Sequence, residues 1–216
     1  MKKSIVSIVV LLITITCKGQ SNPGIMIPAF KDEYTETIKK LESGITDIDY
    51  RNFRESFLNS EQFKVASKRS GEKDSLKKYM YTLMAKKNYT EIIHVTKQIL
   101  SIDYTTMIAH KILRQTYNII GDTANASKYK TIQFGLLNSI VQNGDGRTCA
   151  TAWPVIKVEE EYFILQMIGA TLQNQSIDDE GGICDKMQVR TEEGESKTYY
   201  FDIVKVMEGY KKLGIK

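Results

Sequence analysis

The stretch "QNGDGRTCATAWPV" (residues 142–155) divides this 216-residue sequence into two parts with different hydrophobic patterns. Before it, apolar residues recur every three or four positions, as on the buried face of a helix; after it, they alternate, as in a strand. Gly144 suits the left-handed residue that ends a helix, and Asp145-Gly146 is a strong turn pair. We therefore interpret the stretch as a structural joint in which Asp145 carries no chemistry.

Two functional interpretations of this joint have less support. A calcium loop would need carboxylates at several alternating positions, and the stretch offers only Asp145. A phosphate-binding loop would need Lys-Ser or Lys-Thr after its last glycine and a strand before its first. Here a helical pattern precedes Gly144, so the structural interpretation is favoured.

The part before the joint is predicted to be helical from residue 32 to residue 141. "DEYTETIKKLESG" (32–44) and "DIDYRNFRESFLNSEQF" (47–63) predict two or three helices. "KKNYTEII" (86–93) and "IIGDTANA" (119–126) then align at a spacing of 34 residues, a period that resembles that of tetratricopeptide repeats. Two units are fewer than the three that a free-standing array needs, so the second part of the chain is expected to cover them.

The repeat alignment predicts a concave groove between the helices. Five polar or aromatic side chains are expected to point into it: Lys77, Tyr81, Lys111, Gln115 and Asn118. Grooves of this kind usually hold a protein or peptide segment. The alternative is that the groove holds the second part of this same chain.

The part after the joint is predicted to be a small, mostly antiparallel sheet with one or two helices. The expected elements are a strand in "AWPVIKV" (152–158), a short helix in "EEEYFILQMIGA" (159–170), strands in "TLQNQSI" (171–177), "CDKMQVRT" (184–191) and "KTYYFDI" (197–203), and a last helix in "VMEGYKKL" (206–213). The three glutamates that open the short helix suit the positive end of its dipole. The predicted fold class is α+β, with a helical repeat-like region over residues 20–142 and the sheet region, packed on it, over residues 147–216.

The first residues, "MKKSIVSIVVLLITITCKGQSNP" (1–23), have the features of a secretory signal peptide. Two lysines precede an apolar run of twelve residues, which is shorter than the roughly 20 needed to cross a bilayer. Cleavage after Gly19 is preferred and would release a periplasmic or extracellular protein. Cleavage before Cys17 would instead give a lipoprotein of the cell envelope, and only lipidation at Cys17 would attach the chain to a membrane.

The charges and cysteines of the remaining chain limit its partners and its chemistry. Without residues 1–19, 27 basic side chains face 26 acidic ones, and no basic stripe indicates binding to nucleic acid. Cys149 and Cys184 are a possible disulfide in an oxidising compartment, and two buried thiols are the alternative.

No assembled set of catalytic or metal-binding residues is found in the sequence, so no catalytic residue, metal or cofactor is predicted. Its two histidines lack metal-ligand spacing; His110 is expected in the core and His94 on a solvated helix edge. A nucleophilic site built from Cys149, a histidine and an aspartate would need residues from both parts to converge. The favoured function is non-enzymatic binding or scaffolding, and the alternative is an envelope hydrolase or other enzyme with a site between the two parts.

The order of a helical half, "NGDG" (143–146), "TAWPVIKVEEEYFILQMIGATLQNQS" (151–176), "DKMQV" (185–189) and "YYFDI" (199–203) resembles an exported Bacteroidetes family. That family is known only as a domain of unknown function, number 4919. The resemblance implies an envelope location and a fold of helices plus a sheet. It implies no catalytic residues.

Overall fold

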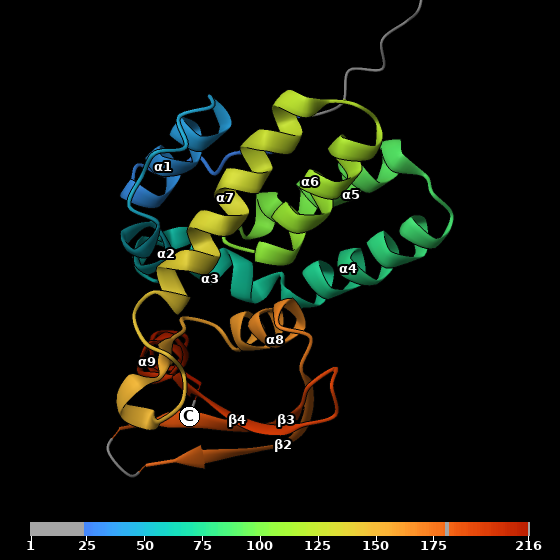
Figure 1. Cartoon of the computed structure of the whole chain (residues 1–216). Coiled ribbons are helices and arrows are strands. Elements are labelled where there is room, and N and C mark those ends of the chain that lie inside the picture. Colours follow the sequence, from blue (N-terminus) through green and yellow to red (C-terminus); the bar gives the residue numbers. More distant parts are fainter. Residues whose placement is uncertain (1–23, 180–181, 216) are drawn as a thin grey trace, which may run out of the picture.

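The computed structural model describes residues 24–179 and 182–215 (Figure 1). The predicted signal peptide and Cys17 lie outside these residues. In the described part of the chain, seven α-helices precede the joint. They are α1 (Glu33–Glu42), α2 (Tyr50–Asn59), α3 (Glu61–Lys68), α4 (Ser70–Ala85), α5 (Tyr89–Ile102), α6 (Met107–Ile119) and α7 (Thr123–Val141).

Polar residues fix where most of these helices begin. In each case the side chain accepts a hydrogen bond from a backbone N–H of the first helical turn, which stabilises a helix end by about 1 kcal/mol. The capping residues are Asp32, Asp49, Ser60, Asn88 and Asp122, for α1, α2, α3, α5 and α7. Ser60 both ends α2 and begins α3, so the stretch expected at residues 47–63 contains the break between two helices.

The spacing of 34 residues appears in the structure as two successive helical hairpins, α4–α5 and α6–α7. Asn88 and Asp122 occupy equivalent N-cap positions of the second helix in each hairpin. The residues before them, Lys87 and Gly121, both have a positive φ, of 55° and 81°. Each hairpin therefore turns in the same way, with glycine meeting the conformational requirement in one turn and lysine in the other.

The second half forms a four-stranded sheet in the order β1-β4-β3-β2. Its elements are the 3₁₀ turn η1 (Cys149–Thr151), β1 (Trp153–Pro154), α8 (Val158–Met167), β2 (Thr171–Asp178), β3 (Cys184–Arg190), β4 (Ser196–Asp202) and α9 (Val204–Lys212). β2, β3 and β4 pair in antiparallel fashion, whereas β1 runs parallel to β4. The α+β fold predicted from the sequence is confirmed.

The strand expected over residues 152–158 is much shorter than predicted. Only Trp153 and Pro154 pair with β4, opposite Phe201 and Asp202. Pro154 has no N–H to donate to a strand ladder, and α8 already begins at Val158. The apolar residues of this segment fill the core as an irregular connection rather than as a strand.

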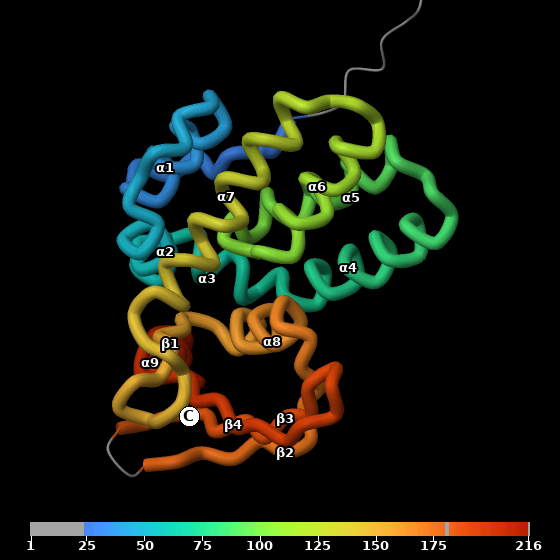
Figure 2. The backbone as a smooth tube through the Cα atoms, in the orientation of Figure 1, coloured from blue at the N-terminus to red at the C-terminus, as the bar shows by residue number. Residues whose placement is uncertain are grey.

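Helix α8 lies between the helical half and the sheet, as the tube in Figure 2 shows. Ile164 and Leu165 of α8, and Val155 just before it, are buried. One continuous hydrophobic cluster joins these side chains to the cores of both halves. The sheet contributes Met187 and Phe201 to this cluster. The two halves therefore share a core instead of meeting at a polar surface.

The joint itself is fixed by close backbone contacts. Gly144 is not in the left-handed region, contrary to the sequence-based expectation; Gly146 is, with φ 66°. Gly144 is needed for a different reason, because a Cβ there would collide with the carbonyl oxygen of Thr151. The carboxylate of Asp145 accepts hydrogen bonds from the N–H of Arg147 (3.0 Å) and the hydroxyl of Thr151 (2.6 Å), as expected of a turn residue.

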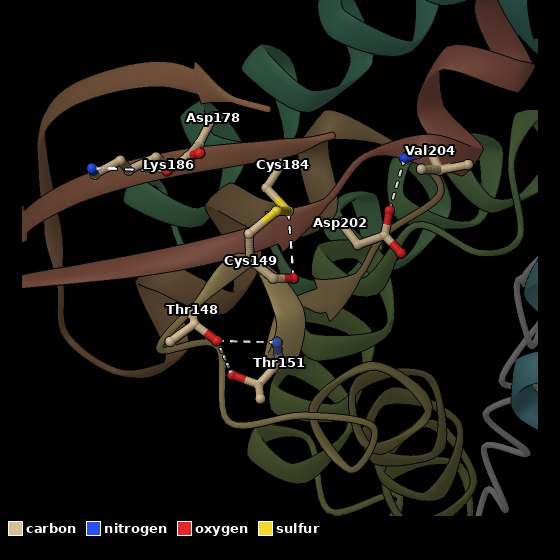
Figure 3. Close-up of a disulfide and its surroundings, with 8 residues drawn as sticks. All are labelled: Thr148, Cys149, Thr151, Asp178, Cys184, Lys186, Asp202 and Val204. Atoms are coloured by element: carbon tan, nitrogen blue, oxygen red, sulfur yellow. Dashed lines mark hydrogen bonds and ion pairs between the residues drawn. A yellow bond between two sulfur atoms is a disulfide. The ribbon is translucent and has the colours of Figure 1, made fainter. Parts of the chain in front are cut away.

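A disulfide joins Cys149, just after the joint, to Cys184 at the start of β3 (Figure 3). The two cysteines are 35 positions apart in the sequence. The bond therefore closes a loop that contains β1, α8 and β2, and it holds η1 against the sheet.

Candidate functional site

A cavity of about 410 Å³ opens where α8 meets the helical half. It lies between α4, the first turn of α6 and the exposed side of α8. Its lining combines charged, polar, aromatic and apolar side chains: Lys77, Tyr81, Thr105, Thr106, Met107, Ile108, Glu159, Glu160, Tyr162, Phe163 and Gln166. We call it the α4/α6/α8 cavity.

The five predicted groove residues lie on α4 and α6. Lys77 and Tyr81 line the α4/α6/α8 cavity. The ammonium of Lys111 lies 6.0 Å from the ring centre of Phe163 on α8. Gln115 and Asn118 line a second hollow of about 460 Å³ farther along the same helices. Helix α8 therefore covers one end of the predicted groove, whereas the other end is open.

A network of partly buried charges lies beside the cavity and reaches it through Lys77 and Glu159. Lys77, Lys73 and Lys157 lie 2.7, 3.2 and 3.1 Å from carboxylate oxygens of Glu159. Lys157 also contacts Asp103 at 2.6 Å, and Lys73 contacts it at 3.3 Å. Most of these side chains are shielded from water, which strengthens their mutual attraction. The network ties α4 and the α5–α6 connection to the N-terminus of α8.

These contacts determine the ionisation of the two acids. Burial by itself would raise the pKa of Asp103, but the ammonium groups of Lys157 and Lys73 outweigh it and hold this pKa at about 2. For the same reason the three lysines hold the pKa of Glu159 well below its ordinary value, against the effect of burial. Both acids are therefore ionised at neutral pH, and the network of three lysines and two acids carries one more positive charge than negative.

The next glutamate of α8 points to a different partner. Glu160 accepts two hydrogen bonds from the guanidinium of Arg54 on α2, at 3.0 and 2.7 Å. It also accepts one from the N–H of Ile156 at 2.8 Å. Both charged side chains are almost completely buried. The pair anchors α8 to the helical half at a second point.

The third glutamate faces the sheet without a charged partner. Glu161 is fully buried, and neither of its carboxyl oxygens has a hydrogen-bond donor within the described chain. Burial raises the pKa of Glu161 to about 9, and the nearby carboxylate of Asp185 raises it further. Glu161 is therefore protonated at neutral pH and able to share its proton with Asp185. Asp185 is itself held by the amide of Gln175 at 2.8 Å.

Sequence reasoning assigned these three glutamates only to the helix dipole and missed their separate partners. Consecutive residues of an α-helix point about 100° apart, so three in a row cannot all face water on a helix that is covered from two sides. The apolar run Phe163-Ile164-Leu165 that follows them covers most of the helix circumference and is the signal that could have indicated such burial.

The residues considered for catalysis do not converge. Cys149 is held in the disulfide and is not a free thiol. His110 is fully buried, with Nε2 2.6 Å from the carbonyl oxygen of Tyr104, and burial lowers its pKa to about 4. Within residues 24–179 and 182–215, no group of three or more potential ligand side chains could hold a metal ion. In the same ranges, no helix has the length and apolar character needed to cross a membrane.

Comparison with known proteins identifies the family of this chain. No curated protein and no solved structure matches it. One family model, described as a domain of unknown function (DUF4919), matches residues 32–212, which include every helix and strand from α1 to α9. The chain belongs to this DUF4919 family.

Proposed function

We propose that this protein is exported to the cell envelope and binds a protein or peptide segment in the α4/α6/α8 cavity without catalysing a reaction. The observation that carries the proposal is the lining of the cavity. Tyr81 and Tyr162 are 48% and 46% exposed, and both border it together with the apolar Met107 and Phe163. Half-exposed tyrosines beside apolar side chains are typical of surfaces that bind protein segments.

A bound segment could extend along the two helical hairpins, α4–α5 and α6–α7. The two hollows follow one another along α4 and α6, and Lys111 lies between the positions that line them. We infer that the hairpins are tetratricopeptide-like and that the segment runs from the cavity past Gln115 and Asn118. α8, which packs against α6, borders the cavity where this path begins.

The sequence of residues 1–23 supports export, with lysines followed by an apolar run of twelve residues. A disulfide between Cys149 and Cys184 agrees with an oxidising compartment. Intact mass of the protein from a native envelope fraction tests both forms of export. Retention of Met1 would contradict export, and a lipid adduct on Cys17 would replace cleavage after Gly19 by the lipoprotein form.

Selection from a displayed peptide library, followed by titration of the selected peptides, tests binding. Replacing Tyr81 and Tyr162 together by alanine is expected to weaken binding at least about tenfold, as for aromatic residues at the centre of an interface. Tyr79→Ala is the matched control, because Tyr79 is equally exposed on α4 and does not line the cavity. If no peptide is selected, or if both sets of variants behave alike, the cavity is not the binding site.

A further inference from the structure

The first turn of α6 opens into the α4/α6/α8 cavity with unused hydrogen-bond donors. The N–H groups of Met107 and Ile108 donate to no acceptor in the part of the chain that the structure describes. Both residues line the cavity, and Met107 is only 3% exposed. The first N–H groups of any helix have no acceptor inside the helix, so at this largely shielded end they need one from outside it.

The residue that should cap this helix is also unsatisfied. Thr106 occupies the N-cap position, but its side chain makes no capping hydrogen bond. It is 1% exposed, lines the same cavity, and its Oγ1 has no partner. The N–H groups of Met107 and Ile108 thus lack an acceptor in the described chain, next to an unpaired hydroxyl, whereas that of Ala109 donates to the carbonyl of Thr106. The N-terminus of the 13-residue α6 adds the positive end of a helix dipole.

The surrounding charges favour an acceptor that is anionic. Lys77 lines the cavity, and Lys111 lies close to its wall at Phe163. Two acids, Glu159 and Glu160, line it as well, but Glu159 is surrounded by three lysines and Glu160 is bound to Arg54. Their charges are therefore compensated, whereas Lys111 lies against the ring of Phe163 and forms no ion pair within the described residues.

We propose that the N-terminus of α6 is the binding site for a carboxylate of the bound segment. This inference rests on the proposed function and names the chemical group that its partner must carry. The two oxygens of a carboxylate match the N–H groups of Met107 and Ile108, and the hydroxyl of Thr106 is a further donor. A phosphate dianion fits less well, because Lys77, the lysine that lines the cavity, is already paired with Glu159 and leaves little positive charge to balance a second negative one.

Acetate tests the site directly. In ¹⁵N–¹H spectra of the purified protein, the amide signals of Met107 and Ile108 are expected to move saturably with sodium acetate and not with sodium chloride at equal ionic strength. Lys77→Gln should weaken the acetate response about two- to fivefold, the size of a partly exposed ion-pair interaction. Lys78→Gln is the matched control, because Lys78 is the next residue on α4 and does not line the cavity. It should leave the response unchanged.

Thr106→Asp supplies a carboxylate from the chain itself. Aspartate is a good N-cap residue, so this variant is expected to lose the acetate response and to unfold at a higher urea concentration than the parent. Thr106→Val, which removes only the unpaired hydroxyl, should weaken the acetate response and keep the fold. The inference is wrong if the two amides do not move in the parent, if chloride moves them equally, or if Thr106→Asp still responds to acetate.

The two proposals can fail separately. If selected peptides bind in a manner that depends on Tyr81 and Tyr162, but acetate leaves the Met107 and Ile108 signals in place, only the carboxylate site is wrong. If acetate binds and no peptide does, the carboxylate site exists and the proposed function is wrong.

Discussion

Arg54 and Glu160 form a two-pronged ion pair that joins α2 to α8 inside the protein, with side chains only 3% and 2% exposed. Glu160 also accepts the N–H of Ile156, so the carboxylate organises the segment that leads into α8. The attachment of the second half to the helices depends on this one guanidinium more than on any exposed salt bridge.

Removing one member of this pair should be much more damaging than removing both. Arg54→Met leaves a buried carboxylate without its partner and is expected to lower the free energy of unfolding by about 3–5 kcal/mol. Adding Glu160→Gln should restore more than half of the loss, because glutamine keeps an acceptor for Ile156 and carries no charge. Urea unfolding measures both variants.

Arg51→Met is the control for these two variants. Arg51 lies on the same helix, but its ion pair with Glu55 is exposed, so its removal should cost less than about 1 kcal/mol. A double variant no more stable than Arg54→Met alone would show that the pair is not the source of the loss.

Glu161 should make the protein less stable as the pH rises. Its pKa is about 9 in the folded protein and near 4.5 in the unfolded chain, so the unfolded chain loses this proton first. Stability therefore falls between about pH 4.5 and 9, by at most about 1.4 kcal/mol per pH unit. Folding lowers the pKa of His110 from 6.5 to about 4, so His110 makes stability rise with pH, but only below about pH 6.5. The pH dependence of stability between about pH 7 and 9 therefore reports on Glu161.

Glu161→Gln removes the ionisation and should flatten the pH dependence of the urea midpoint over this interval. The variant is expected to be more stable than the parent at about pH 9. Glu208→Gln, at an exposed position on α9, should leave the slope of the parent unchanged. Equal slopes in the parent and Glu161→Gln would mean that Glu161 is already ionised in the folded protein.

The disulfide between Cys149 and Cys184 should contribute substantially to stability. Closing a loop of this length restricts the unfolded chain, and its loss is expected to cost about 2–4 kcal/mol. Urea unfolding with and without reductant measures the difference, and a variant with alanine at both positions should not respond to reductant. Two free thiols per chain in the unfolded, unreduced protein would contradict the bond.

The joint should depend on Gly144 far more than on the charge of Asp145. Gly144→Ala places a methyl group against the carbonyl of Thr151, and we expect a loss of at least about 2 kcal/mol. Asp145→Asn keeps the oxygen that accepts from Arg147 and Thr151, so its effect should be much smaller.

Gly71→Ala serves as the control for Gly144→Ala, because a Cβ at Gly71 meets no atom within 4 Å. It should be neutral or stabilising within α4. Calcium supplies a second test of the joint. A calcium-dependent urea midpoint that disappears in Asp145→Asn would show that the joint is a metal site after all.

Local signals were sufficient to predict the helices and most strands from the sequence. Asp32, Asn88 and Asp122 start helices where their side chains predict, and Gly44 and Gly169 end them with a positive φ. Of the three long strands, only β3 shows the expected alternation, with Met187 and Val189 buried; β2 is exposed along most of its length, and in β4 only Phe201 is buried. Such features depend on residues a few positions apart.

The candidate site could be predicted only in part, because its contacts join residues distant in the sequence. Lys77 was expected in the groove, but its partner Glu159 is 82 residues away. Arg54 gave no local sign of burial, since its partner lies on the other side of the joint. Likewise, Gly144 was assigned a left-handed conformation because nothing in its neighbourhood reveals that Thr151 folds back against it.

The distance between Arg54 and Glu160 along the chain also has a consequence for biosynthesis. Arg54 leaves the ribosome 106 residues before Glu160 does, an interval of about 5–20 s at ordinary rates of translation. During that time the guanidinium has no carboxylate to meet, and enclosing it in an apolar core would cost several kcal/mol. We therefore expect the nascent helical half to keep the surroundings of Arg54 hydrated and loosely packed. Its final structure is completed only when α8 emerges, so the two halves mature as one unit.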